Sequence, residues 1–190
     1  MMKALSSILM VALIVVMSLV VAVSLEPAIA ADDEKPKLPE LNRKIVQFCT
    51  DNLGKKVGDG ECAALALAAL DKAGAKGPSD LPAPKPPMKK DDFVWGRLLD
   101  PKEDVLPGDL MQFRDVEIKF NSPRLSYSYS YPHHTAIVAE VKGKQKFVVF
   151  EQNVGGPDKT EEQRRIVQKT TLDFSAKVKG TVWIYRPVEK

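Results

Sequence analysis

The fold of this chain is decided by the stretch Gly58-Asp59-Gly60-Glu61-Cys62-Ala63-Ala64-Leu65. Its glycines break the chain before a helix that we expect from about Glu61 to Lys72, with Gly74 ending it. The run from Ala63 to Leu70 is apolar on every side, which is typical of a helix enclosed by other elements. Cys62 therefore begins the central helix of the predicted domain.

A thiol at a helix start is suited to attack a carbonyl group. The thiolate is the reactive form, and an unperturbed pKa of about 8.5 leaves little of it at neutral pH. The free N–H groups at a helix start lower that pKa, and they also stabilise the oxyanion of a tetrahedral intermediate. The alternative is that Cys62 is a small buried hydrophobic residue. Gly58 and Gly60 favour catalysis, because they leave room for a substrate.

The two histidines of the chain, His133 and His134, stand at the start of a predicted strand that runs to Val141. A second strand, from Phe147 to Asn153, follows after a short turn, and the two are expected to form a hairpin. The hairpin would bring an imidazole next to the polar residues that end the second strand.

Two positions of the hairpin turn place His134 beside these polar residues. A turn centred on Lys142 and Gly143 puts His134 opposite Glu151, and a turn centred one residue later puts it opposite Asn153. In both alternatives the three side chains share one face of the hairpin. His134 is thus the predicted base, and Glu151 or Asn153 is the group that orients it.

A slip by one residue would instead pair His134 with Gln152 and bring His133 level with Asn153. We favour the other registers because they match side chains of compatible size on one face: Ala136, Val138, Phe147 and Val149. The remaining alternative is that both histidines are hydrated surface residues.

The other cysteine, Cys49, lies on the apolar face of a predicted first helix that begins near Leu41 and continues to Leu53. This position predicts a buried core thiol. A disulfide between Cys49 and Cys62 is the alternative for an exported chain, and it would prevent Cys62 from acting as a nucleophile.

Strands follow the helices along the chain. A proline-rich loop at 78–87 precedes a possible short strand at 93–99, and Pro107-Gly108-Asp109 is a turn signal before a long strand at 110–120. Alternating tyrosines at 127–131 predict a return arm that Pro132 stops. Further strands are expected at 165–172 and 179–186. Helices first and antiparallel strands afterwards predict an α+β fold.

The first 30 residues have the pattern of a signal peptide. A lysine at position 3 precedes the apolar run 8–25, and Ala28-Ile29-Ala30 is a small-x-small site that predicts cleavage after Ala30. The alternative is an uncleaved membrane anchor, because the apolar run approaches the roughly 18–20 residues that span a bilayer. Both alternatives place the rest of the chain in the cell envelope, the periplasm or outside the cell.

Removal of residues 1–30 takes away one lysine and one glutamate, so the net charge stays at +3. This is too small to indicate a nucleic-acid partner. We expect a linker at 31–40 and one domain at 41–188. We expect no cofactor and no metal ion, because two cysteines and two adjacent histidines match no usual zinc spacing. Membrane contact is expected only with a retained signal segment.

These motifs, taken in order, resemble the landmarks of the CHAP domain, the cysteine, histidine-dependent amidohydrolase/peptidase of the papain-like and NlpC-type group. The similarity covers most of residues 41–188 and is carried by Gly-Asp-Gly-Glu-Cys-Ala-Ala-Leu at 58–65, Leu-Pro-Gly-Asp-Leu-Met-Gln-Phe at 106–113, His-Thr-Ala-Ile-Val at 134–138, Phe-Glu-Gln-Asn at 150–153 and the closing segment 180–187. The segment 116–132 is longer than the family's compact hairpin, and Ala63 stands where a large aromatic residue is common.

The resemblance implies a papain-like α+β fold with Cys62 as nucleophile, His134 as base, Glu151 as orienting residue and Asn153 assisting. It also implies cleavage of amide bonds in cell-wall peptidoglycan, by an N-acetylmuramoyl-L-alanine amidase or an endopeptidase, with peptidoglycan or another peptide as substrate. An inactive wall-binding module, an acyltransferase on the same scaffold and a structural envelope protein are the alternatives. The sequence gives no indication of the oligomeric state.

Overall fold

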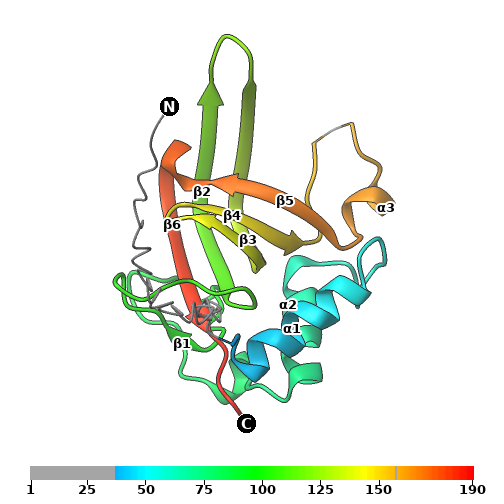
Figure 1. Cartoon of the computed structure of the whole chain (residues 1–190), viewed down its shortest axis with the longest axis vertical. Coiled ribbons are helices and arrows are strands. Elements are labelled where there is room, and N and C mark those ends of the chain that lie inside the picture. Colours follow the sequence, from blue (N-terminus) through cyan, green and yellow to red (C-terminus); the bar gives the residue numbers. More distant parts are fainter. Residues whose placement is uncertain (1–36, 157) are drawn as a thin grey trace, which may run out of the picture. The chain divides into compact units, whose positions relative to one another are not determined.

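The computed structural model of the chain describes residues 37–156 and 158–190. The expected signal peptide at 1–30 and the first six residues of the expected linker lie outside the described residues. The described part combines helices with a six-stranded antiparallel sheet, which confirms the predicted α+β class (Figure 1). None of its helices is long and apolar enough to cross a membrane.

The two main helices agree closely with the sequence pattern. α1 (Glu40–Asp51) starts one residue inside the expected linker, and α2 (Cys62–Ala73) begins at the cysteine itself. Gly74 ends α2 in the left-handed conformation, with a φ of 80°, which a glycine adopts without steric cost. A short helix, α3 (Glu161–Arg164), lies in a segment for which the sequence pattern indicates no regular structure.

The sheet has the strand order β1-β6-β2-β3-β4-β5. Its strands are β1 (Arg97–Leu98), β2 (Leu110–Asn121), β3 (Ser126–Gly143), β4 (Lys146–Glu151), β5 (Gln168–Asp173) and β6 (Lys177–Arg186). Two short 3₁₀ helices, η1 (Pro78–Asp80) and η2 (Phe174–Ala176), complete the described elements. The outer half of the β2–β3 hairpin extends beyond the other strands (Figure 1).

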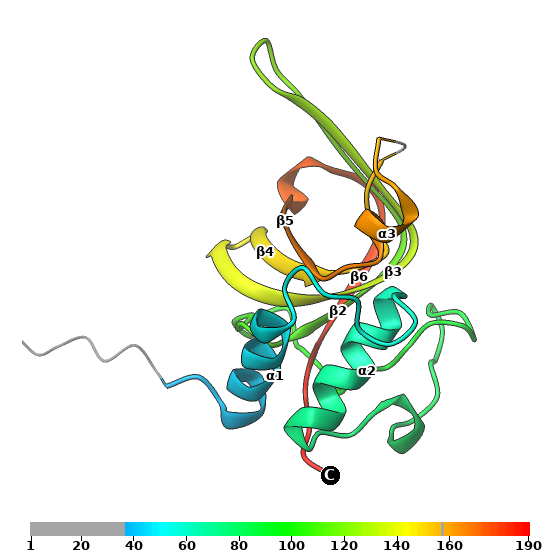
Figure 2. The same cartoon turned by 90° about the vertical axis from the view of Figure 1, so that its right-hand side faces the viewer.

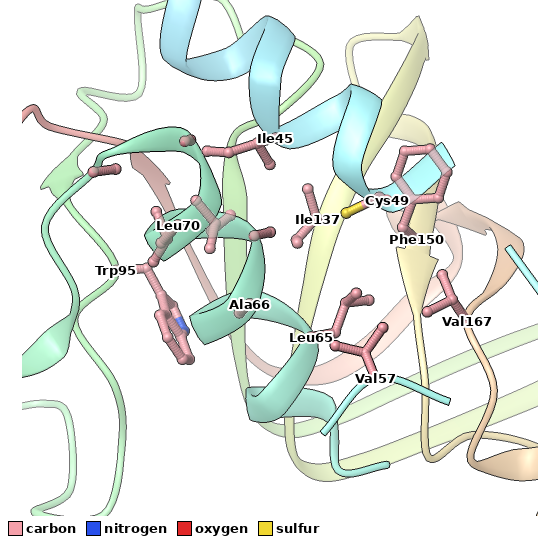
Figure 3. Close-up of a cluster of buried hydrophobic side chains, with 14 of the residues drawn as sticks. Ile45, Cys49, Val57, Leu65, Ala66, Leu70, Trp95, Ile137, Phe150 and Val167 are labelled. Atoms are coloured by element: carbon pink, nitrogen blue, oxygen red, sulfur yellow. The ribbon is translucent and has the colours of Figure 1, made fainter. Parts of the chain in front are cut away.

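The two faces of the sheet carry separate hydrophobic cores. Leu110, Ile137 and Phe150 lie side by side on β2, β3 and β4 and pack against α1 and α2 on one face. Their neighbours Met111 and Ala136 belong to a second core on the opposite face, which the sheet curls around (Figure 2). Cys49 points from α1 into the first core (Figure 3), as its place on the apolar face predicted. The alternation follows from the period of two along a strand.

The expectation that Pro132 stops a strand was wrong, because β3 continues from Ser126 to Gly143. The β2–β3 ladder pairs Arg114 with His133 and Val116 with Tyr131, but it skips the position between them. Opposite Pro132 stands Asp115, whose φ is +54°. A proline has no N–H to give to a ladder, and here it occupies a position where the ladder is already interrupted.

A buried carboxylate connects α1 to the sheet. Asp109, which precedes β2, is fully buried and accepts hydrogen bonds from the Asn42 side chain at 2.8 Å and from the Arg186 guanidinium at 2.8 and 3.0 Å. The N–H of Leu106 donates to the same carboxylate at 2.8 Å. The sequence indicates Asp109 only as a turn residue, and in the structure it also joins the first helix to the last strand.

Candidate active site

Cys62 is the first residue of α2, and its side chain is partly exposed. Both cysteines are free thiols, so the alternative of a disulfide between them is absent from the structure. Cys49 is buried in the core, and burial raises its pKa to about 12. Only the thiol at the helix start is therefore both accessible and suited to ionise.

The pKa of Cys62 lies below its ordinary value. Burial acts to raise the pKa, but a hydrogen bond to the His134 side chain and the charge of that imidazole lower it. The N–H groups of Thr135 and Ala63 add further hydrogen bonds to the sulfur. Each of these donors stabilises the thiolate over the thiol. The surroundings of Cys62 thus favour a nucleophilic sulfur.

His134 is held between the thiol and a carboxylate. It is 4% exposed, and its Nε2 lies 3.0 Å from Oε2 of Glu151, which is 1% exposed. Since Nε2 is engaged with Glu151, Nδ1 is the nitrogen left to face Cys62. Burial acts to lower the pKa of His134, but the hydrogen bonds to Cys62 and Glu151 raise it to about 9. The imidazole is therefore protonated at neutral pH, as a thiolate–imidazolium pair requires.

The β3–β4 register explains why Glu151 is the partner of His134. The ladder pairs Ile137 with Phe150 and Val138 with Val149, and continuation of this register puts His134 level with Asn153. β4 ends at Glu151, and Asn153 has a φ of +59°, so the chain has already turned away. The diagonal neighbour Glu151 then makes the hydrogen bond. Near the site the register is that of the second alternative, but the expected turn position was wrong. The turn lies at Lys144 and Gln145, and two register shifts in the hairpin compensate for the difference. The carboxylate is the residue that contacts the ring.

Asn153, the predicted assisting residue, lies nearby but contacts another group. Its amide donates a hydrogen bond to the Glu61 carboxylate, which also accepts one from Arg165 at 2.7 Å. No hydrogen bond between Asn153 and His134 is present among residues 37–156 and 158–190. Asn153 and Arg165 therefore fix the residue that directly precedes the nucleophile.

Gln152 is a functional residue that the sequence analysis missed. It is fully buried, and its side-chain amide donates to the carbonyl oxygens of Val57 at 2.9 Å and Glu61 at 2.7 Å. The N–H of Val57 donates back to its side-chain oxygen at 3.3 Å. Gln152 thereby fixes both ends of the turn that leads into Cys62. Alternation along β4 could have indicated it, since the residue after Glu151 must face the side that carries the helices.

Aromatic rings enclose the other side of His134. The Tyr131 ring is stacked on the imidazole with a centroid distance of 4.9 Å, and the Phe113 ring lies at 5.7 Å. Burial raises the pKa of Tyr131 well above its ordinary range, so it stays a neutral phenol. These rings restrict the imidazole to one orientation and shield its bond to Glu151 from water.

His133 faces away from this site. Its ring is stacked with Phe93 at a centroid distance of 6.0 Å, and its Nε2 lies 3.6 Å from Asp92, a buried carboxylate that binds Arg114. Burial and the charge of Arg114 lower the pKa of His133, so it is neutral at pH 7. The two adjacent histidines thus have different surroundings, and only His134 contacts Cys62.

Residues 37–156 and 158–190 contain no group of three or more histidine, cysteine, aspartate or glutamate side chains placed to hold a metal ion. The chemistry that the arrangement supports is attack by a cysteine, with an imidazole as proton carrier and a carboxylate that orients it.

A comparison with curated proteins and one with solved structures gave no match. The family model that matches residues 39–190 is described as the AIM3/BBC1 cysteine proteinase-fold domain. It agrees with the papain-like fold that the sequence motifs implied and with the helix-borne cysteine seen here. The chain therefore belongs to the AIM3/BBC1 cysteine proteinase-fold domain family.

Proposed function

We propose that this domain is a cysteine hydrolase that cleaves amide bonds in peptides. The observation that carries the proposal is the contact of Cys62, at the start of α2, with a buried imidazole that is bonded to Glu151. A thiol, an imidazole and a carboxylate in this order form a nucleophile, a base and an orienting group. A structural thiol needs none of these neighbours.

The proposed reaction has two steps. The Cys62 thiolate attacks the carbonyl carbon of the amide, and the imidazolium of His134 gives its proton to the nitrogen as the C–N bond breaks. The amine leaves and a thioester remains on Cys62. Water then attacks the thioester and gives a proton to His134, and the C–S bond breaks to release a carboxylic acid and restore the thiolate.

The start of α2 supplies stabilisation for the oxyanion formed in each step. Glu61, at the N-cap of the helix, makes no side-chain hydrogen bond to the helix N–H groups. Its carboxylate binds Asn153 and Arg165 instead. Of the first N–H groups of the helix, that of Ala63 faces the sulfur and that of Ala64 donates to the Glu61 carbonyl oxygen at 3.1 Å. The N–H of Cys62 has no hydrogen-bond partner in the described part of the chain and is the group that would bind the oxyanion.

The CHAP-like motifs extend the proposal to a substrate and a location. They support bacterial cell-wall peptides as a substrate class to test, with N-acetylmuramoyl-L-alanine amidase and endopeptidase as the two reaction types. The signal-peptide pattern at 1–30 supports export with cleavage after Ala30, so that the domain would act in the cell envelope or outside the cell.

The proposal is tested by incubating the purified protein with cell-wall sacculi and, separately, with a pool of linear peptides, and by measuring product masses. We expect new carboxyl-terminated fragments, formed at least about 10³-fold more slowly by Cys62→Ala. Cys49→Ala is the matched control, because it removes the other thiol outside the site, and it should retain activity.

The outcomes separate the alternatives. Products joined to an added amine in place of water would show an acyltransferase. Binding of sacculi without new masses, equal for the parent and Cys62→Ala, would show a wall-binding module and contradict the hydrolase.

A further inference from the structure

A groove leads away from His134 and Glu151 along the edges of two strands. It has a volume of about 800 Å³, and His134 and Glu151 line one part of it. The rest is formed by residues 128–133 of β3, residues 168–171 of β5 and the loop that follows β4. The groove thus reaches the imidazole and the carboxylate of the proposed site, whereas Cys62 is not among its lining residues.

The lining shows that the groove follows strand edges. Successive side chains of a strand point to opposite faces, so a cavity over one face is lined by alternate residues. Here seven consecutive residues, 128–134, line the groove on one side, and four consecutive residues, 168–171, line it on the other. The main chain of both strands is therefore presented to it.

Both edges are without a strand partner in the described part of the chain. β3 pairs with β4 only from Ile137 onwards, and the other edge of β3 is covered by β2. β5 is the last strand of the sheet, and β4 covers its one paired edge. Figure 2 shows β5 curling round towards β3. Unpaired N–H and C=O groups of such edges are templates for a further strand.

The β3 edge runs directly to the nucleophile. The N–H of Thr135, one residue beyond the groove, hydrogen-bonds to the sulfur of Cys62. A chain paired along residues 128–134 is therefore guided to the thiolate, with its main chain already fixed by hydrogen bonds.

We propose that this groove binds a linear peptide segment in extended conformation, which adds to the free edge of β3 and presents one of its amide bonds to Cys62. The proposal rests on the hydrolase function and specifies its substrate. Seven strand residues span roughly 20 Å, so about six substrate residues would be bound. Strand addition is an established mode of peptide recognition, in which main-chain hydrogen bonds supply the affinity.

The side chains of the groove suit main-chain recognition. Small hydroxyl residues, Ser128, Ser130, Thr170 and Thr171, belong to its lining. Its acidic and lysine residues are Glu151, Asp158, Lys159 and Lys169, two of each sign. The groove therefore has no strong charge preference, and we expect uncharged linear peptides to be accepted. Tyr129, on the same stretch of β3, offers an aromatic surface to one side chain of the peptide.

The test uses a pool of linear hexapeptides, from which the fastest substrate is chosen by product mass. If no hexapeptide is cut, the one that binds most tightly to the Cys62→Ala protein is chosen. Single N-methyl groups are then placed along its main chain. Since a strand bonds to one neighbour only at every second residue, N-methylation should lower kcat/KM about tenfold at alternate positions and little between them. The same alternation should appear when these peptides compete for binding to the Cys62→Ala protein.

A protein variant gives a second measurement. Ser130→Pro removes an N–H and places a ring in the groove, so kcat/KM for the hexapeptide should fall about tenfold or more. Ser126→Pro is the matched control, because it lies on the same strand outside the groove lining. Alkylation of Cys62 by iodoacetamide should proceed at the parent rate in both variants, which shows that the site is intact.

The outcomes distinguish this proposal from the hydrolase function. Strand addition is overturned, and the hydrolase function kept, if turnover depends on Cys62 but the N-methyl effects do not alternate. The same conclusion follows if Ser130→Pro and Ser126→Pro lower kcat/KM equally. Strand addition is also overturned if sacculi are cut and linear hexapeptides are neither cut nor bound. If no peptide is turned over but N-methylation weakens binding to Cys62→Ala at alternate positions, strand addition in the groove is supported and the hydrolase function is contradicted.

Discussion

Glu151 and Gln152 are neighbours in the chain, yet the first holds the imidazole of His134 and the second holds the turn that precedes Cys62. Successive residues at a strand end point to opposite sides, and here the two sides are the two halves of the site. The end of β4 therefore sets the position of the imidazole relative to the thiol. The contributions of Glu151 and Gln152 to the reaction can be tested separately by substitution of each residue.

Gln152→Ala is expected to lower kcat about 10–100-fold with little change in KM, because the turn at 57–61 loses its buried hydrogen bonds and Cys62 is no longer held against His134. Steady-state kinetics on a peptide substrate measures this. Gln47→Ala, which removes an exposed amide from α1, is the control and should match the parent. A rise in KM with kcat unchanged would show that Gln152 acts on substrate binding instead.

Glu151→Gln is expected to move the alkaline limb of the pH profile to lower pH. The reactive pair needs ionised Cys62 and protonated His134, so activity is lost as pH rises through the pKa of His134, about 9 in the parent. Loss of the carboxylate charge lowers this pKa by about 1–3 units. The pH dependence of kcat/KM on a peptide substrate measures the shift, with the exposed Glu140→Gln as control. An unmoved limb would contradict the role of Glu151.

Iodoacetamide should add to one cysteine of the folded protein at neutral pH. Cys62 is partly exposed and has a lowered pKa, whereas burial excludes Cys49 from solvent and raises its pKa to about 12. Peptide mapping by mass spectrometry should therefore find the adduct on Cys62 before unfolding and on both cysteines after it. Faster labelling of Cys49, or labelling of neither, would be inconsistent with the site described.

Asp109→Ala is expected to lower the free energy of unfolding by about 3–5 kcal/mol, because the partly buried guanidinium of Arg186 and the amide of Asn42 lose their shared acceptor. Urea denaturation gives the value. Asp71→Asn is the matched control, since this aspartate is 80% exposed in its ion pair with Lys190, and its effect should stay within about 0.5 kcal/mol. Equal effects in both variants would show that the buried pair contributes little.

Local sequence determined much of the fold and the place of each catalytic candidate on its helix or strand. The glycine turn and the apolar run place Cys62 at the first residue of α2, and the period of two puts His134 and Glu151 on one face of the β3–β4 hairpin. Both conclusions rest on contacts between residues close in sequence. The α+β class follows from the order of the same local patterns.

Tertiary structure alone decided which polar residue contacts the imidazole and what holds the thiol to it. The turn position left Glu151 and Asn153 as equal partners for His134, and the early end of β4 selected the carboxylate. The hydrogen bonds of Gln152 span about ninety residues of chain, and the free edges of β3 and β5 exist only once the sheet has formed. No local pattern specifies such contacts, because they depend on how distant segments pack.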